Sequence, residues 1–268
     1  ARELARRCGL QQPPLVALIT ATDTVTPAPF AAGPTAELPR TRCTGGFSVA
    51  ARHDATDALR PRARAVLMRL AVDAGRPVAI DTLVADVWGD HDGTARRGIQ
   101  VAVSAIRKAL HDDGAERTVD RVDDGYVLTL PPRGSSDLDE FRAAADEVAR
   151  AMSAPDRLAA AERALAAVGG ELLPAAVASD WLVAARDQFA QHVARVATAG
   201  ATAAIEIDDA PAAIRLAEIG LEFDRYHDEL WRVVIDAHER RGDTVTAERL
   251  RRDYAMVLDE LGLGSPVE

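Results

Sequence analysis

Basic and amide side chains recur along one side of a helical pattern near the middle of the chain. Arg97, Val101, Ser104 and Lys108 follow the spacing of a single helix face. Three further polar residues flank this stripe: Arg96, Gln100 and Arg107. Arg and Lys bind guanine edges or phosphates, and Gln binds adenine, when a helix lies in the major groove. The stripe therefore indicates a surface for duplex DNA, with a merely solvated helix face as the alternative.

The same segment carries an apolar stripe on its opposite side. Ile99, Val103, Ile106 and Leu110 recur at helical spacing, and Thr94 is placed to cap the helix at its start. A helix with one apolar and one polar face packs its apolar face on a core. The polar stripe is therefore expected to face outward.

Two shorter helices are predicted ahead of this one, after a short strand at residues 47–50. Pro61 stands at a helix start, and Gly75 follows an apolar stripe that ends near residue 74. The second helix is expected over residues 81–88, ending at Gly89. Trp88, like the other two tryptophans, lies within an amphipathic pattern, which favours core packing over a ligand platform.

Two β-prone runs follow, at residues 118–122 and 126–130, and Asp124-Gly125 between them is a strong hairpin signal. Three helices and a terminal hairpin predict a winged helix-turn-helix. Arg121 in the hairpin is a candidate DNA contact, with simple solvation equally compatible. Asp120 and Asp123 place negative charge beside it, which would subtract from affinity for phosphates.

Breaks in composition divide the chain into three parts. Residues 1–39 are expected to be an N-terminal segment and linker, the end of a preceding region; residues 40–133 a winged-helix domain; and residues 134–268 an all-helical domain. In the last part, Asp209, Ala213 and Leu216 recur 34 residues later as Asp243, Ala247 and Leu250, the period of tetratricopeptide helix pairs. The expected fold class is thus mainly α, with a short N-terminal sheet, a β-hairpin wing and a tetratricopeptide-like helical domain.

Charge is unevenly distributed. The net charge is −10, yet residues 40–133 hold 15 basic and 13 acidic residues, while residues 134–268 hold 14 and 26. The acidity therefore belongs to the C-terminal half, and the middle third can still carry a basic face. The apolar content of 48 % is sufficient for buried cores.

Several functional classes find no support in the sequence. No apolar run approaches the length of a membrane span, so no membrane contact is expected. Cys8 and Cys43 are too few for a disulfide framework, which favours a cytoplasmic protein. No metal ligand set or cofactor motif is present; His227 and His238 lie too far apart along a helix to share a metal. No catalytic constellation or phosphate loop appears either, and we expect no enzyme, cofactor or metal.

Residues 77–90 (PVAIDTLVADVWGD), residues 95–110 (ARRGIQVAVSAIRKAL) and Gly125-Tyr-Val-Leu128 closely resemble the antibiotic-regulatory transcription activators of actinobacteria, the SARP or AfsR/DnrI-like proteins. The tail from Ala237 to Pro266 is similar to the end of their bacterial transcriptional activator domain. Together these matches span residues 40–268. The resemblance implies an OmpR-type winged helix that binds promoter DNA and a helical domain that supports activation and dimerisation.

The chain departs from that family inside the predicted DNA-binding helix. Where many members carry Val-Ser-Arg-Leu-Arg-Lys, this chain has Val103-Ser-Ala-Ile-Arg-Lys108, so an arginine of the major-groove surface is replaced by Ala105. Ala105 offers no hydrogen bond to a guanine edge. We therefore expect weaker discrimination among operators than the resembled family achieves.

Two hypotheses follow for function. The first is a sequence-specific regulator of transcription, an activator by resemblance, that binds double-stranded promoter DNA as a homodimer and contacts RNA polymerase. The second is a module of a larger signalling protein, whose winged helix has lost DNA specificity and whose helical domain binds a small-molecule or protein effector.

Overall fold

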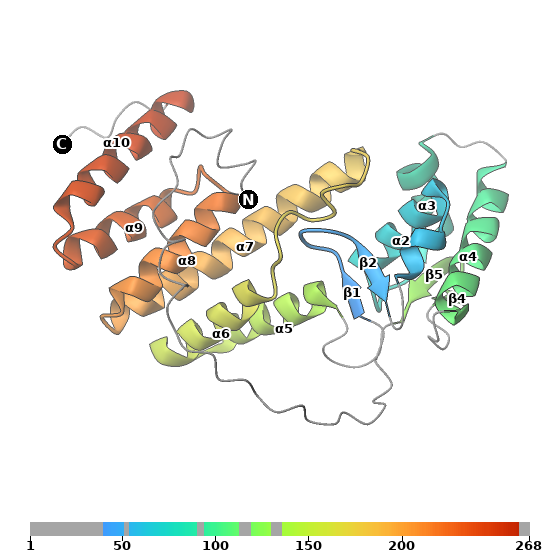
Figure 1. Ribbon diagram of the computed structural model, residues 1–268, viewed down its shortest axis with the longest axis horizontal. Coiled ribbons are helices and arrows are strands. Elements are labelled where there is room, and N and C mark those ends of the chain that lie inside the picture. The colour runs from blue at the N-terminus through green and yellow to red at the C-terminus, as the bar shows by residue number, and fades with distance from the viewer. Residues whose placement is uncertain (1–39, 51–53, 90–93, 113–118, 130–135, 263–268) are drawn as a thin grey trace, which may run out of the picture. The chain divides into compact units, whose positions relative to one another are not determined.

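The computed structural model describes residues 40–50, 54–89, 94–112, 119–129 and 136–262, all of which fall within one compact unit. Strands β1 and β2 and helices α2, α3 and α4 gather on one side of it, and α5 to α10 follow as a succession of helices (Figure 1). The fold class is the predicted one: mainly α, with a short N-terminal sheet and a wing hairpin ahead of a helical region.

Three helices form the first part of the fold: α2 (Pro61–Val72), α3 (Ile80–Trp88) and α4 (Ala95–Asp112). Pro61 stands at the first turn of α2, and Gly75 and Gly89 take positive φ angles of 77° and 75° just beyond α2 and α3. The end of α3 at Gly89 is the predicted one, whereas α2 ends at Val72, with Asp73 as its C-cap, and so stops short of the expected end at Gly75. The apolar stripe of α4 is buried along its whole length.

A three-stranded sheet of order β3-β5-β4 completes the winged helix, with β3 (Val78–Ala79), β4 (Val119–Val122) and β5 (Gly125–Leu128) all antiparallel. The hairpin turn is Asp123-Asp124, with Asp123 at φ 49°, and not the expected Asp124-Gly125. Gly125 pairs with Ala79 instead, and a Cβ there would lie 2.7 Å from the Val78 carbonyl oxygen. This glycine therefore serves the close approach of β3 and not the turn.

The N-terminal sheet is a two-stranded hairpin of β1 (Arg40–Arg42) and β2 (Ser48–Ala50), followed by the short 3-10 helix η2 (Ala55–Ala58). The Asp54 carboxylate accepts hydrogen bonds from the backbone N–H and the hydroxyl of Thr56. It thus caps η2 and fixes where the chain enters the three-helix part.

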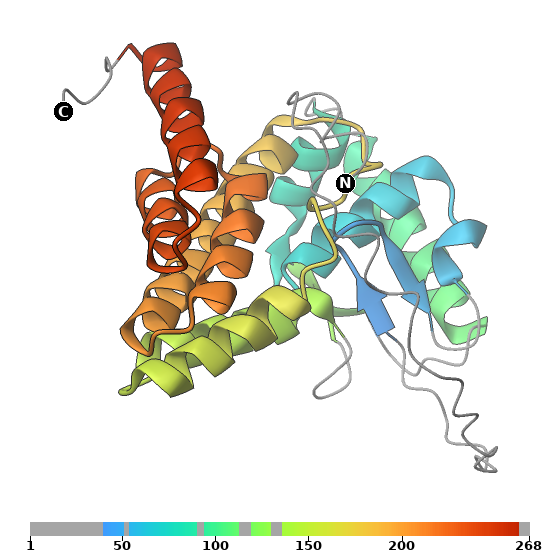
Figure 2. The ribbon, with the colours of Figure 1, turned by 60° about the vertical axis from the view of Figure 1, so that its left-hand side comes forward.

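Six helices build the C-terminal region: α5 (Asp137–Arg150), α6 (Ala154–Ala166), α7 (Asp180–Glu206), α8 (Ala210–Phe223), α9 (Asp228–Arg240) and α10 (Thr244–Glu260). Each packs on the next along the chain, and α7 also packs on α5 and α9 (Figures 1 and 2). Trp231 is half-buried in a stack on Tyr254, with ring centroids 5.9 Å apart. That tryptophan packs between α9 and α10, as predicted.

The 34-residue repeat marks equivalent helix starts. Asp209 and Asp243 are the N-caps of α8 and α10, and each carboxylate accepts a hydrogen bond from the third residue of its helix, Ala212 and Thr246 respectively. Ala213 is fully buried, and Ala247 repeats that burial in α10. The repeat in sequence is therefore a repeat in helix capping and packing.

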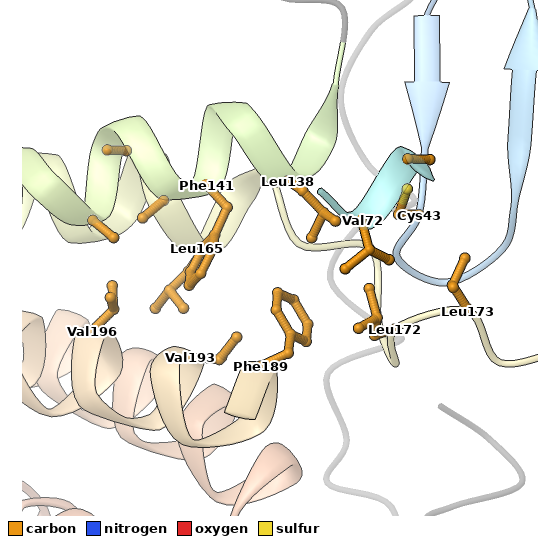
Figure 3. Close-up of a cluster of buried hydrophobic side chains, with 14 of the residues drawn as sticks. Cys43, Val72, Leu138, Phe141, Leu165, Leu172, Leu173, Phe189, Val193 and Val196 are labelled. Atoms are coloured by element: carbon orange, nitrogen blue, oxygen red, sulfur yellow. The ribbon is translucent and has the colours of Figure 1, made fainter. Parts of the chain in front are cut away.

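One buried cluster joins the winged helix to the helical region (Figure 3). Cys43 from the β1–β2 turn and Val72 at the end of α2 pack with Leu138 of α5 and with Leu172 and Leu173 of the segment between α6 and α7. The boundary predicted after residue 133 therefore adjoins a packed interface. That residues 40–133 and 134–268 are separate domains stays a prediction.

Candidate DNA-binding surface

Helix α4 is held in place by its contact with α3. Trp88, the last residue of α3, lies against Gly98 of α4, where a Cβ would come within 2.8 Å of the indole ring. The Arg62 guanidinium lies over the ring, 5.3 Å from its centroid, and Trp88 is half-buried in this contact between helices. A glycine inside a helix costs about 1 kcal/mol relative to alanine. Here it permits the close approach that sets the position of α4.

The predicted stripe lies on the outer face of α4. Arg97, Val101, Ser104 and Lys108 are all exposed, with Val101 at 64 %, and Gln100 is exposed beside them. The polar side chains of this group form no hydrogen bond or ion pair with any residue that the structure describes. We refer to these five residues as the reading stripe. It offers charge, an amide and a hydroxyl to a ligand without breaking any contact to another described residue.

The two flanking arginines are engaged with the protein. Arg96 forms an ion pair with Asp81 in the first turn of α3, with 2.6 Å between Nη2 and Oδ1. Arg107 donates from Nε to the Val119 carbonyl oxygen of β4 at 2.8 Å, so it ties α4 to the wing. The sequence pattern assigned both arginines to the DNA face, because helical spacing does not show which side chains form ion pairs or hydrogen bonds within the protein. Arg107 retains its terminal N–H groups for a phosphate.

The wing carries one basic residue of the predicted site and several acidic ones. Arg121 is exposed on β4, and Asp120, Asp123 and Asp124 are exposed around it. Three carboxylates next to one guanidinium make the wing unfavourable for phosphate. Of the eight predicted site residues, Arg121 has the surroundings least suited to DNA.

His111 extends the reading stripe and was not among the predicted residues. It is exposed three positions after Lys108, so it continues the same helical face near the end of α4. The signal was available in the sequence, since the spacing that links Arg97 to Lys108 reaches His111 one step later. Gly98 was also missed as a positioning residue; a glycine near the start of a strongly amphipathic helix was its signal.

Arg69 of α2 connects the helix-turn-helix with α7. Its guanidinium pairs with Asp73 at the end of α2 and, through Nε, with Asp86 of α3 at 2.7 Å. The same guanidinium lies 5.2 Å from the centroid of the Trp181 ring in the first turn of α7. Trp181 is thus an inter-helix packing residue, as predicted, and one arginine holds α2, α3 and α7 together.

The β1–β2 turn connects the winged helix with α5. The Asp137 carboxylate, only 7 % exposed at the start of α5, accepts hydrogen bonds from the backbone N–H groups of Cys43 and Thr44 and from the Thr44 hydroxyl, at 2.7 to 3.0 Å. The same hydroxyl accepts from the Gly169 N–H at 2.8 Å. Burial, and after it the Asp137 carboxylate, raises the pKa of the Cys43 thiol, which therefore stays protonated.

Outside α4, the described part of the chain carries a groove but no metal site. An open groove of about 480 Å³ lies along α5 and α6, lined by Glu147, Arg150, Asp156 and Arg163 among others, and Arg163 pairs with Glu147 inside it. No group of His, Cys, Asp and Glu side chains among the described residues is arranged to hold a metal ion. No helix found there is long and apolar enough to cross a membrane.

Comparison with known proteins agrees with this geometry. A family model described as transcriptional regulatory protein, C terminal, matches residues 55–128. The solved structure of Mycobacterium tuberculosis EmbR in complex with a low-affinity phosphopeptide superposes with a TM-score of 0.68 at 24 % sequence identity, over 85 % of this chain. This chain spans 62 % of that one. No curated protein matches.

The family match includes α2, α3, α4 and the wing, which are the elements that carry and position the reading stripe. The structural match extends the likeness in fold to the helical region, at an identity that shows fold alone. Residues 55–128 therefore fold as a winged helix and are similar to the C-terminal part of transcriptional regulatory proteins.

Proposed function

We propose that this protein is a transcription regulator that binds double-stranded promoter DNA sequence-specifically through α4. The reading stripe is the observation that carries the proposal. It places basic, amide and hydroxyl groups on one exposed face of the third helix of a winged helix, without partners among the described residues. These are the groups that contact base edges and phosphates in a major groove.

The proposed site divides by contact type. Gln100, Val101 and Ser104 lie at the middle of the stripe and face base edges, while Arg97 and Lys108 lie toward its ends. Of the flanking residues, Arg107 reaches a phosphate with its terminal N–H groups, and Arg96 does so when it leaves Asp81. Arg121 contributes a phosphate contact only where the charge of the wing permits it.

The second part of the proposal concerns the helical region, α5 to α10. Its 34-residue repeat of capped helices supports a tetratricopeptide-like architecture, and the resemblance to the SARP family supports a role in activation, through dimerisation or contact with RNA polymerase. Because Asp137 and Arg69 connect this region to the winged helix, an effector that moved the helices would also move the DNA-binding elements.

The alternative is a protein- or effector-binding module without DNA specificity. The acidic wing and the engagement of Arg96 and Arg107 favour it, because both reduce the positive charge available to DNA. The open groove along α5 and α6 is where a small polar effector would find charged groups.

Fluorescence anisotropy of the whole chain separates the two functions. Binding is measured against a randomised duplex pool and its best-selected member at several salt concentrations. A regulator shows a steep log–log salt dependence and prefers the selected duplex by roughly 10³-fold or more. Flat salt dependence with equal affinity for both duplexes would instead support the effector-binding module.

A further inference from the structure

The reading stripe has an exposed valine at its centre, although the residues around it are mostly polar. Val101 is 64 % exposed, and Ala105, one helical turn further on, is exposed as well. Exposed valines occur singly on many surfaces. This one stands out by its place, because it occupies the centre of the face that the winged-helix fold presents to DNA.

The length of the stripe decides which of its residues can reach base edges. Lys108 lies eleven positions after Arg97, about 16 Å along a helix, whereas the major groove is about 12 Å wide. A helix lying across the groove therefore brings both ends of the stripe toward the sugar-phosphate backbones. Residues 100 to 105 span only about 8 Å and fit between them.

Residues 100–105 include no arginine or lysine, the side chains that bind guanine edges. Arg96 and Arg107 are engaged with Asp81 and with the Val119 carbonyl. Gln100 is exposed and has no partner among the described residues, and an amide of this kind pairs with the N6 and N7 positions of adenine. A valine at the adjacent position can bury the C5 methyl group that distinguishes thymine.

We propose that Val101 and Gln100 give this protein a preference for A·T base pairs at the centre of its recognition helix, with Val101 contacting a thymine methyl and Gln100 an adenine edge. The inference rests on the proposed DNA-binding function and specifies its chemical target. It also assigns Arg97 and Lys108 to phosphates, so that they supply affinity without sequence information.

The test removes single methyl groups from DNA. A duplex selected from a randomised pool is resynthesised with each thymine in turn replaced by uracil, which keeps base pairing and charge and deletes only the methyl. At one or two positions the wild-type protein should bind about fourfold more weakly, as expected for a buried methyl-sized group. Val101→Ala should bind the thymine and uracil forms of these duplexes equally.

A second substitution tests the adenine contact. Replacing adenine by 7-deazaadenine removes the N7 acceptor, and at one position it should weaken the wild-type protein about tenfold and leave Gln100→Ala unaffected. Val245→Ala is the matched control, since Val245 of α10 is another exposed valine, outside the stripe and 78 % exposed. It should retain the wild-type response to both modified bases.

The outcomes distinguish failure of the A·T preference from failure of the proposed DNA binding. Salt-dependent binding to the selected duplex that no uracil or 7-deazaadenine substitution weakens would overturn the A·T preference and leave DNA binding intact. An unchanged methyl response in Val101→Ala would overturn the role of Val101. Failure to bind any duplex, with circular dichroism showing a folded chain, would overturn the proposed function together with this inference.

Discussion

Two polar regions of this molecule differ in what their polar atoms contact. At the β1–β2 turn, the buried carboxylate of Asp137 accepts hydrogen bonds from Cys43 and Thr44, and Thr44 in turn accepts one from Gly169. On α4, the polar side chains of the reading stripe are exposed and have no partner among the described residues. The first arrangement holds two parts of the fold together, and the second leaves its groups available to a ligand.

Bonding partners, more than residue types, distinguish the structural polar groups of this fold from those of the candidate site. Arg69 and Arg97 are both arginines of the winged helix. Arg69 is bound to Asp73 and Asp86 and stacked near Trp181, whereas Arg97 is exposed. Substitutions in the first region should therefore change stability, and substitutions in the second should change DNA binding.

The largest expected effect is on stability, from Asp137→Ala. This change leaves two buried backbone N–H groups and the Thr44 hydroxyl without their acceptor, and each unsatisfied group costs about 1–3 kcal/mol. We expect the free energy of unfolding in urea to fall by about 3 kcal/mol or more. Asp137→Asn, which keeps one acceptor oxygen, should lose less. A loss below about 0.5 kcal/mol for Asp137→Ala would show that the turn is not a structural anchor.

Gly98→Ala should weaken DNA binding at least tenfold. The added Cβ meets the Trp88 ring at 2.8 Å, so α4 must shift on α3, although alanine itself favours the helix by about 1 kcal/mol. The double-mutant cycle with Trp88→Leu is the control, because there the ring that is in the way is gone and Gly98→Ala should cost little. Wild-type DNA affinity of Gly98→Ala would mean that this contact does not position the reading stripe.

Ala105→Arg should sharpen the recognition of sequence. Ala105 is exposed on α4, one turn beyond Val101, and an arginine there can add a bidentate contact to guanine worth about 1–3 kcal/mol for a subset of duplexes. If the new guanidinium reaches a phosphate, every duplex should bind more tightly and the salt slope should steepen by about 0.9. Unchanged affinity for a randomised pool and for duplexes reselected with the mutant would argue that α4 does not enter the groove in this register.

The smallest expected effect comes from releasing Arg96. Its ion pair with Asp81 is exposed, with 56 % and 64 % of the two side chains accessible, so Asp81→Ala should change stability by less than about 1 kcal/mol. The freed guanidinium should tighten DNA binding a few-fold at low salt. Glu206→Ala, which releases Arg157 on α6 from a comparable pair, is the control and should leave DNA binding unchanged. Equal gains in both variants would point to net charge and not to the position of Arg96.

Local signals predicted the winged helix well. Pro61 marks the start of α2, Gly89 marks the end of α3, and the apolar stripe of α4 fixes which face is buried; both kinds of signal act within a few residues. The hairpin turn was misplaced by one residue because Gly125 serves a contact with β3, more than 40 positions earlier in the chain. Composition near the turn cannot reveal such a distant partner.

The candidate site was predicted as a set of residues but not as a set of contacts. The spacing of Arg97, Val101 and Lys108 placed them correctly on one exposed face. The pairing of Arg96 with Asp81, by contrast, joins two helices and depends on how they cross. The Asp137 anchor contacts Cys43 and Thr44, which lie 94 and 93 positions earlier in the chain. No pattern within either segment indicates this contact.

Whether α4 is the DNA-binding helix is decided by the salt dependence of DNA binding in the Arg97→Ala/Lys108→Ala double mutant. Each basic residue on a phosphate contributes about 0.9 to the slope of log affinity against log salt. The double mutant should therefore lose about 1.8 units of slope and remain folded, while Arg241→Ala, which removes an exposed arginine beyond α9, should keep the wild-type slope. A folded double mutant with the wild-type slope and affinity would contradict the assignment of α4 as the DNA-binding helix.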